Sequence, residues 1–253
     1  MSSVIQNRSG LISFRVSEEE GRVFIVASVK TPVDAREAAS LLYTQIAEVL
    51  SERGMVCVHE RIFGRLSVEH DVISARRQAF ASFGISPENP VTYIEGNSPS
   101  GAVCAMDLMA VLNSEKCTRK LSNPSQLDAF RYGSAFARAS VVNNGSTALI
   151  EVSGTAAIDE HGVSLYPGDI RAQIHCTFDK VAALLKQEDA ELKDICSATV
   201  FVKRPEFAEI FYEMAAARGL ENFPCVCIVA DVCREELLFE IDAEAVVKTG
   251  GKG

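Results

Sequence analysis

The pattern of apolar residues repeats once along the chain, and this repeat is the strongest constraint on the fold. In the first half, an apolar run at 23–29 precedes a stretch at 34–51 whose apolar residues recur at spacings of three and four, which is typical of a helix. The second half repeats this order at 148–152 and 169–186. Each half then continues with a strand, a further helix and two closing strands. The repeated order, offset by about 130 residues, predicts an internal duplication.

The repeat divides the 253 residues into two domains of the α+β class. We expect a first domain at 10–115, a linker at 116–132, a second domain at 133–248 and a tail at 249–253. The linker is predicted from its polar composition. In each domain a mixed sheet should carry two helices packed on one face.

Charge and hydropathy exclude several classes of partner. The chain has 25 Lys and Arg against 34 Asp and Glu, a net charge of −9. Nucleic-acid binding normally needs a basic face, because phosphate neutralisation dominates its affinity, so we expect no nucleic-acid partner. No apolar run approaches the roughly 18 residues that a membrane span requires, so we expect no membrane partner.

The cysteines and histidines indicate a reduced protein without a metal. The eight cysteines are scattered, with no CxxC pair, and the four histidines do not join them at zinc-ligand spacing. The first residues show neither the basic nor the apolar region of a secretion signal. These features predict a cytoplasmic protein with free thiols, no metal and no cofactor.

Several stretches of the second half resemble the RidA/YjgF family of small trimeric enamine and imine deaminases. The resemblance covers about 135–248, and it implies that family's fold for this half and for its diverged first-half copy. The matching stretches, in order, are Val152-Ser153-Gly154, Gly168-Asp169-Ile170 with Gln173, Ala198 to Lys203, Phe223-Pro224, Glu240 to Ala243, and Ala245-Val246.

The site that this resemblance implies departs from that of the deaminases. Their arginine, which grips the substrate carboxylate just after the proline of the penultimate strand, is replaced here by Cys225. Their tyrosine near the domain start is replaced by Phe136, whereas their cysteine and glutamate remain as Cys227 and Glu240. Imine deamination is therefore the less favoured function.

In the first half the corresponding positions fall near Thr92, for the arginine, and at Ala105, for the glutamate. We therefore expect any working site to be built around the second half, with Arg76 reaching in from a surface of the first half.

Other stretches resemble the chorismatases, which are longer proteins built from two RidA-like halves. This resemblance implies hydrolysis of chorismate to pyruvate and either a dihydroxy-cyclohexadiene acid or 3-hydroxybenzoate. The stretches are Ala75-Arg76-Arg77-Gln78-Ala79-Phe80, Asn123-Pro124-Ser125-Gln126 with Tyr132-Gly133 and Phe136-Ala137-Arg138-Ala139, and Val232-Cys233-Arg234 running on to Glu240-Ile241.

The resemblance assigns roles to individual residues. Glu240 would donate a proton to the vinyl carbon of an enol ether, and a raised pKa in an apolar pocket would suit it to this task. Cys233 would help to position the substrate or partition products. Arginine side chains would pair with the two carboxylates of chorismate. The expected substrate-binding residues are Arg76, Arg138, Gly154, Phe136, Cys227 and Arg218, of which Arg218 is proposed from its position at a helix end alone.

Each of these residues also has a purely structural interpretation. Strand alternation places Glu240, Asp242 and Glu244 on one face, which could be a solvated polar face. Cys227 and Cys233 could pack as small apolar side chains. Gly154 could serve a bulge or a turn rather than a ligand, and any of the arginines could lie on the surface.

Three functions follow from these alternatives. The first is a chorismatase-like hydrolase or lyase that acts on a small anionic substrate. The second is a RidA-type deaminase with an altered site, and the third is a non-catalytic metabolite-binding protein. A tandem chain of this kind could be a homo-oligomer, such as a trimer, or a pseudo-symmetric monomer.

Overall fold

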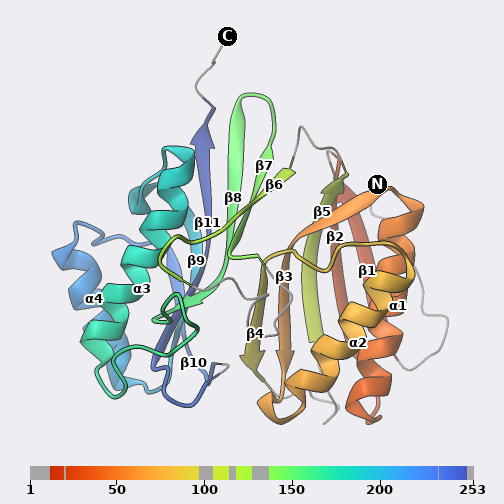
Figure 1. The fold of residues 1–253 in the computed structure, drawn as a ribbon, viewed down its shortest axis with the longest axis horizontal. Coiled ribbons are helices and arrows are strands. Elements are labelled where there is room, and N and C mark those ends of the chain that lie inside the picture. The colour runs from red at the N-terminus through yellow and green to blue at the C-terminus, as the bar shows by residue number, and fades with distance from the viewer. Residues whose placement is uncertain are drawn as a thin grey trace. The chain divides into compact units, whose positions relative to one another are not determined.

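The fold is described from a computed structural model, which defines residues 12–19, 21–96, 105–113, 118–126, 137–232 and 234–249. The chain divides into two compact units, at 1–115 and 116–253. Each unit is described by itself (Figure 1).

The first unit is a five-stranded mixed sheet with two long helices. Its sheet has the order β1-β2-β5-β3-β4, in which only β3 and β4 are parallel neighbours. In chain order the elements are β1 (Ile12–Glu19), β2 (Arg22–Val29), α1 (Ala35–Glu52), β3 (Met55–Gly64), α2 (Glu69–Ser82), β4 (Val91–Glu95) and β5 (Ala105–Leu112), with a short 3-10 helix at Leu66–Val68.

The second unit repeats this architecture with one added strand. Its sheet has the order β10-β9-β11-β8-β7-β6, and only β9 and β10 are parallel. The elements are β6 (Thr118–Leu121), β7 (Ala139–Asn143), β8 (Thr147–Ala156), α3 (Ile170–Leu185), β9 (Ile195–Val202), α4 (Glu206–Ala217), β10 (Cys225–Val229) and β11 (Phe239–Lys248), with short 3-10 helices at Lys186–Glu188 and Leu192–Asp194.

Strand order and register confirm the duplication. When β6 is set aside, the order β10-β9-β11-β8-β7 matches β4-β3-β5-β2-β1 strand for strand. The registers agree as well, because Glu240 pairs with Phe201 as Ala105 pairs with Phe63. The predicted α+β fold, with a mixed sheet and two helices in each half, is therefore confirmed.

The helices form where apolar spacing and capping residues predicted them. Asp34 caps α1 by accepting hydrogen bonds from the backbone N–H groups of Arg36 and Glu37, at 2.9 and 3.3 Å. Asp169 caps α3 in the same way, through Ala172 at 3.0 Å. Such caps satisfy backbone donors that the first turn of a helix leaves open.

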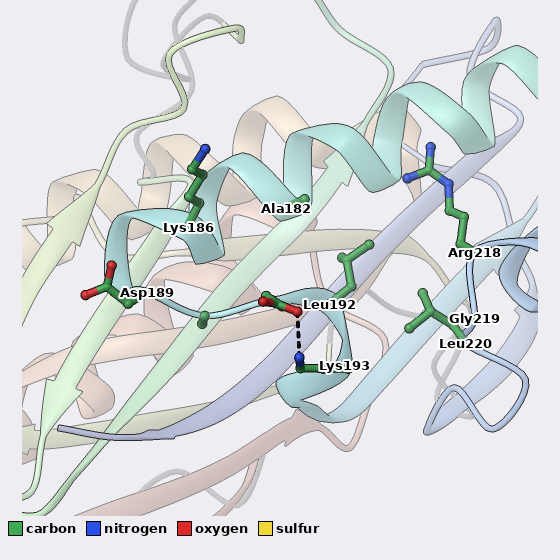
Figure 2. A pocket seen from close by; sticks show the side chains of 10 residues that line it. Ala182, Lys186, Asp189, Leu192, Lys193, Arg218, Gly219 and Leu220 are labelled. Atoms are coloured by element: carbon green, nitrogen blue, oxygen red, sulfur yellow. Dashed lines mark ion pairs between the residues drawn. The ribbon is translucent and has the colours of Figure 1, made fainter. Parts of the chain in front are cut away.

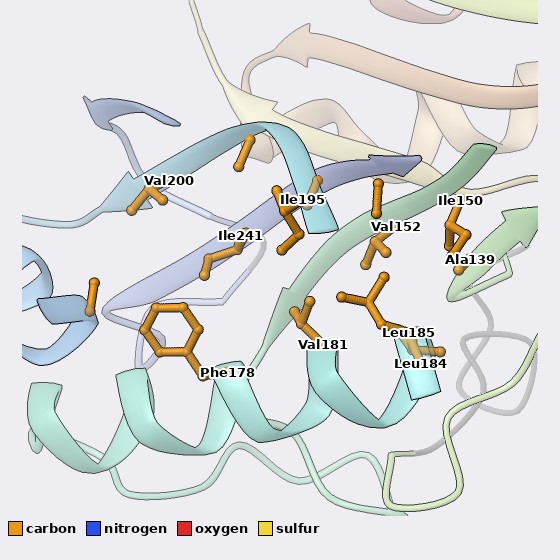
Figure 3. Close-up of a cluster of buried hydrophobic side chains, with 14 of the residues drawn as sticks. Ala139, Ile150, Val152, Phe178, Val181, Leu184, Leu185, Ile195, Val200 and Ile241 are labelled. Carbon is orange, nitrogen blue, oxygen red and sulfur yellow. The ribbon is translucent and has the colours of Figure 1, made fainter. Parts of the chain in front are cut away.

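The core of the second unit lies between α3, α4 and one face of the sheet. Phe178, Val181 and Leu184 of α3 point toward Val152 of β8 and Ile241 of β11 (Figure 3). Burying each such side chain is worth about 1.5–3 kcal/mol. This apolar layer covers one face only, so the residues that alternate with it on the strands lie on the opposite face.

The structure differs from the sequence expectation at three strands. Residues Thr118–Leu121, predicted as linker, form β6, which pairs antiparallel with β7. Strands β1 and β7 were not predicted, although Ile12, Phe14 and Val16 of β1 alternate as buried residues. The predicted tail lies outside the described residues from position 250 onward.

Candidate functional site

Glu240 lies on β11, in the middle of the second sheet. It is paired with Phe201 of β9 on one side and with Ala156 of β8 on the other. Its neighbours in the chain, Phe239 and Ile241, belong to the core under the helices. Alternation therefore places the Glu240 carboxyl on the face away from the helices, and only 4% of the residue is exposed.

Asp242 shares this face and is buried to the same extent, whereas Glu244 is exposed. Asp242 Oδ1 accepts a hydrogen bond from the backbone N–H of Thr199, at 3.1 Å. Glu151, which pairs with Glu244 from β8, is also buried. Three carboxylates on this face, those of Glu240, Asp242 and Glu151, are therefore buried. The face is not the solvated polar face that strand alternation alone allowed.

Gly154 lies in a bulge of β8. The register of β8 against β11 shifts between Ile241 and Ala243, so Ser153 and Gly154 together oppose Asp242. A bulge bends the strand and re-aims its side chains, and glycine is common in one. Gly154 thus lies on the strand next to β11, at the level of Asp242.

Arg138 is anchored to the same bulge through its backbone. Its carbonyl accepts hydrogen bonds from the backbone N–H and the hydroxyl of Ser153, both at 3.1 Å. The residue is almost fully buried, just before β7. The backbone of Arg138 is therefore bonded to β8, the strand next to the one that carries Glu240.

Cys227 lies on the opposite face of the sheet from Glu240. It pairs with Val200 of β9 and packs, with Cys225, against the core under the helices. Burial raises the pKa of both thiols, so they remain protonated near neutral pH and are poor nucleophiles. The structure does not bring Cys227 together with Glu240, and the small apolar interpretation describes it better.

The equivalent face of the first unit lacks the acid. Ala105 occupies the position of Glu240, as the sequence indicated. Asp107, in the position of Asp242, forms a two-point ion pair with Arg61 of β3, at 3.0 and 3.1 Å. In this unit the carboxylate is therefore paired with an arginine of the neighbouring strand.

Arg76 does not lie on a surface of the first unit, as we had expected, but inside it. Its Nε is 2.8 Å from Glu60 Oε2, and its two terminal nitrogens donate to Pro87 O at 2.9 Å and Asn89 Oδ1 at 2.5 Å. Tyr43 donates its hydroxyl proton to the other Glu60 oxygen. Arg76 and Glu60 are both completely buried, so this guanidinium holds α2 to the sheet and is not presented to a substrate.

Arg218 lies on the helix side of the second unit. Its guanidinium donates to Asp179 Oδ1 at 2.9 Å and stacks over Phe178, 5.2 Å from the ring centre. Because Phe178 packs against the face of the sheet opposite to Glu240, Arg218 is separated from Glu240 by the sheet. The expectation that both serve one site is therefore not met.

Arg218 instead lines a pocket of about 570 Å³ at the ends of α3 and α4 (Figure 2). Arg218 and Leu220 lie at one end of this pocket, and Lys186 and Asp189 lie at the other. Lys193 and Glu191, which also line the pocket, form an ion pair at 2.8 Å. The pocket lining thus includes charged side chains of both signs as well as apolar side chains.

Phe136 and Cys233, the two other expected site residues, lie outside the described residues. Within the described ranges, no three His, Cys, Asp or Glu side chains come together in a way that could hold a metal ion. None of the helices in the described part of the chain combines the length and hydropathy that a bilayer crossing requires.

Comparison with known proteins relates this architecture to two groups. The family model described as Endoribonuclease L-PSP matches residues 134–247, which are the second unit without β6. The chorismatase of Streptomyces hygroscopicus is 26% identical over 194 residues, which are 70% of this chain and 55% of that protein. The chain thus spans about half the length of this curated relative.

Among solved structures, a chorismatase crystal structure superposes with a TM-score of 0.78 at 22% identity, covering 92% of this chain and 77% of that one. It therefore has the same fold through both units. RidA from an Antarctic Psychrobacter species aligns with 51% of this chain and 99% of its own, at 18% identity and a TM-score of 0.43.

Proposed function

Because the chain is a member of the RidA/YjgF superfamily, in the two-unit form that resembles chorismatase, we propose that it hydrolyses chorismate or a related carboxylated enol ether and releases pyruvate. The observation that carries this proposal is the buried carboxyl of Glu240 on the central strand β11.

The surroundings of Glu240 suit proton transfer to carbon. Glu240 pairs with Phe201 and Ala156 on the neighbouring strands, and both of these residues are buried. Strands pair with β11 on both sides, which fixes the backbone that carries the acid. A held acid close to its target needs no reorganisation when it transfers its proton.

The chemistry of an enol ether supplies a role for this acid. Protonation of the terminal vinyl carbon by Glu240 would leave an oxocarbenium ion stabilised by the ether oxygen. Water would add to this ion, and the Glu240 carboxylate could take back the proton that the water loses. The bond between the hemiketal carbon and the ether oxygen would then break as the hemiketal hydroxyl proton passes to that oxygen, giving pyruvate and a ring alcohol. The sum consumes one water and leaves Glu240 protonated for the next cycle.

The remaining roles are part of the same proposal. Arg138 is proposed to pair with a substrate carboxylate, since guanidinium binds carboxylate at two points. Gly154 is proposed to let the backbone approach the ligand beside Asp242. Phe136 and Cys233 are retained as substrate-contacting and product-partitioning residues on the basis of the resemblance alone.

The substitution Glu240→Gln tests this proposal. Glutamine keeps the shape and the hydrogen bonding but cannot protonate carbon, so we expect kcat for pyruvate release to fall by about 10² to 10⁴. Chorismate affinity, measured by calorimetry, should change little. Glu244→Gln is the matched control, because Glu244 is exposed on the same face of the same strand. Wild-type turnover in Glu240→Gln would remove Glu240 from the mechanism.

A further inference from the structure

Gln173 is a completely buried polar side chain of α3 that joins segments far apart in the sequence. Its Oε1 accepts a hydrogen bond from the backbone N–H of Leu238, at 2.8 Å. Its Nε2 lies 2.9 Å from the carbonyl of Glu236 and 3.2 and 3.1 Å from those of Leu165 and Tyr166. The amide therefore uses its acceptor and shares its two N–H bonds among three carbonyls.

Two segments meet at this amide. One is the turn at 165–166, just before α3, where Tyr166 has a φ of +54°. A bulky residue in this left-handed region is unfavourable and persists only where the surrounding structure holds it. The other is the turn at 236–238, which leads directly into β11. One side chain thus fixes the entry to a helix and the entry to the strand that carries Glu240.

The turn before β11 is held from a second side as well. The carbonyl of Leu238 accepts a hydrogen bond from the backbone N–H of Lys203, at 3.1 Å, and Lys203 Nζ donates to the carbonyl of Glu235 at 2.8 Å. Both backbone groups of Leu238 are therefore committed, one to Gln173 and the other to the residue that follows β9. Leu238 stands only two residues before Glu240.

We propose that Gln173 is a positioning residue for Glu240, acting through the backbone of Glu236 and Leu238. This inference rests on the proposed function, in which Glu240 is the acid. A misplacement of about 1 Å at a reacting group can cost about 10²-fold in rate. Loss of the Gln173 amide should therefore reduce the rate of the chemical step more than it reduces substrate binding, because Gln173 itself contacts only protein groups.

Two variants and a matched control test the inference. Gln173→Met keeps the length of the side chain and removes all four hydrogen bonds. Gln173→Glu can still accept from Leu238, and its carboxyl, kept neutral by burial among three carbonyls, can donate one O–H bond to them, so its effect should be smaller. Gln187→Met is the control, because Gln187 also donates to two backbone carbonyls, those of Ser122 and Ala183, but on an exposed segment away from β11.

The first readout does not depend on activity. In Gln173→Met we expect faster hydrogen exchange at the Leu238 amide, by about tenfold or more, and a changed NMR titration of the Glu240 carboxyl, assigned with Glu240→Gln. The Gln187→Met control should leave both unchanged. An unaltered Glu240 titration in Gln173→Met and Gln173→Glu would overturn the inference, whether or not the protein hydrolyses chorismate.

The second readout separates positioning from a merely structural role. We expect kcat for pyruvate release to fall about 10²-fold in Gln173→Met, while the Kd for chorismate, measured in the Glu240→Gln background to prevent turnover, stays within about threefold. An unchanged kcat, or equal losses of kcat and affinity, would overturn positioning. If wild-type protein releases no pyruvate but the Glu240 titration moves, the proposed function fails and the structural link from Gln173 to Glu240 stands.

Discussion

At the scale of single residues, the first unit buries an ion pair at a position where the second unit has an alanine. Glu60 and Arg76 are fully buried, and the register places Ala198 in the second unit where Glu60 stands in the first. Taking two charges out of water is costly, and the pair persists because Tyr43 and Asn89 complete its hydrogen bonds.

Breaking this pair should therefore destabilise the protein strongly. We expect Arg76→Ala to lower the free energy of unfolding by about 3–5 kcal/mol, because it leaves Glu60 charged, buried and without its cation. Replacing both partners, as Arg76→Met with Glu60→Leu, should cost less than Arg76→Ala alone. Urea unfolding measures both, with Arg36→Ala on the exposed side of α1 as the control. An Arg76→Ala variant as stable as this control would contradict the role given to the pair.

A second residue-scale prediction concerns His59. Burial, and next the positive charge of Arg61, lower the pKa of His59 from 6.5 to about 3. The folded protein keeps this imidazole neutral, whereas the unfolded chain takes up a proton near pH 6.5. Protons thus favour the unfolded state, and this group should lower stability by about 1.4 kcal/mol for each pH unit between about 6.5 and 3.

His59→Gln removes the titrating group and tests this directly. The difference in unfolding free energy between wild type and variant should be constant above about pH 7.5. As the pH falls below about 6.5, the wild type should lose stability relative to the variant. Parallel stability curves over the whole range would show that His59 is not kept neutral by the fold.

The sequence predicted some of these residue features and missed others for identifiable reasons. Alternation placed Glu240 and Asp242 on one face, but burial depends on what covers that face, which alternation does not encode. A helical arginine is normally exposed. The carboxylate that pairs with the buried Arg76 belongs to Glu60, which lies sixteen residues away on another element. The register of β10 on β9 determines the face of Cys227, and one sequence cannot give that register.

At the scale of elements, the helices were predictable, and three strands, β1, β6 and β7, were not predicted. Helix α3 has both of the signals that sequence can carry, a 3.6-residue apolar period and a capping aspartate, Asp169. Strand β6 has neither alternation nor an apolar face, since only Leu121 of its four residues is buried, and backbone pairing with β7 defines it. Strand β1 does carry the two-residue period, which is sufficient to predict it.

The burial and hydrogen bonds of Gln173 could not be predicted from the sequence either. A glutamine in the first turns of an amphipathic helix is ordinary, and its spacing gives no hint of burial. Its partners lie seven and eight residues before it and more than sixty residues after it. Its presence in the stretch that resembles RidA was the one signal available, and that signal carries no role.

At the scale of the whole molecule, the two units are copies that have diverged in chemistry. The first has an alanine in place of the acid and an ion pair beside it, whereas the second retains Glu240 on a buried strand face. One duplicated fold therefore carries one candidate acid. Strand order and register show this divergence position by position, and the chorismatase structure shares the fold of both units.

The most direct test of this account is a comparison of two substrates for the unmodified protein. Purified protein is incubated with chorismate and, separately, with a system that generates 2-aminoacrylate, and pyruvate is followed in both. The account predicts pyruvate from chorismate in proportion to enzyme, with no acceleration of the hydrolysis of the imine that forms from 2-aminoacrylate. Faster imine hydrolysis with no pyruvate from chorismate would contradict it in favour of a deaminase, and no effect on either would indicate a binding protein.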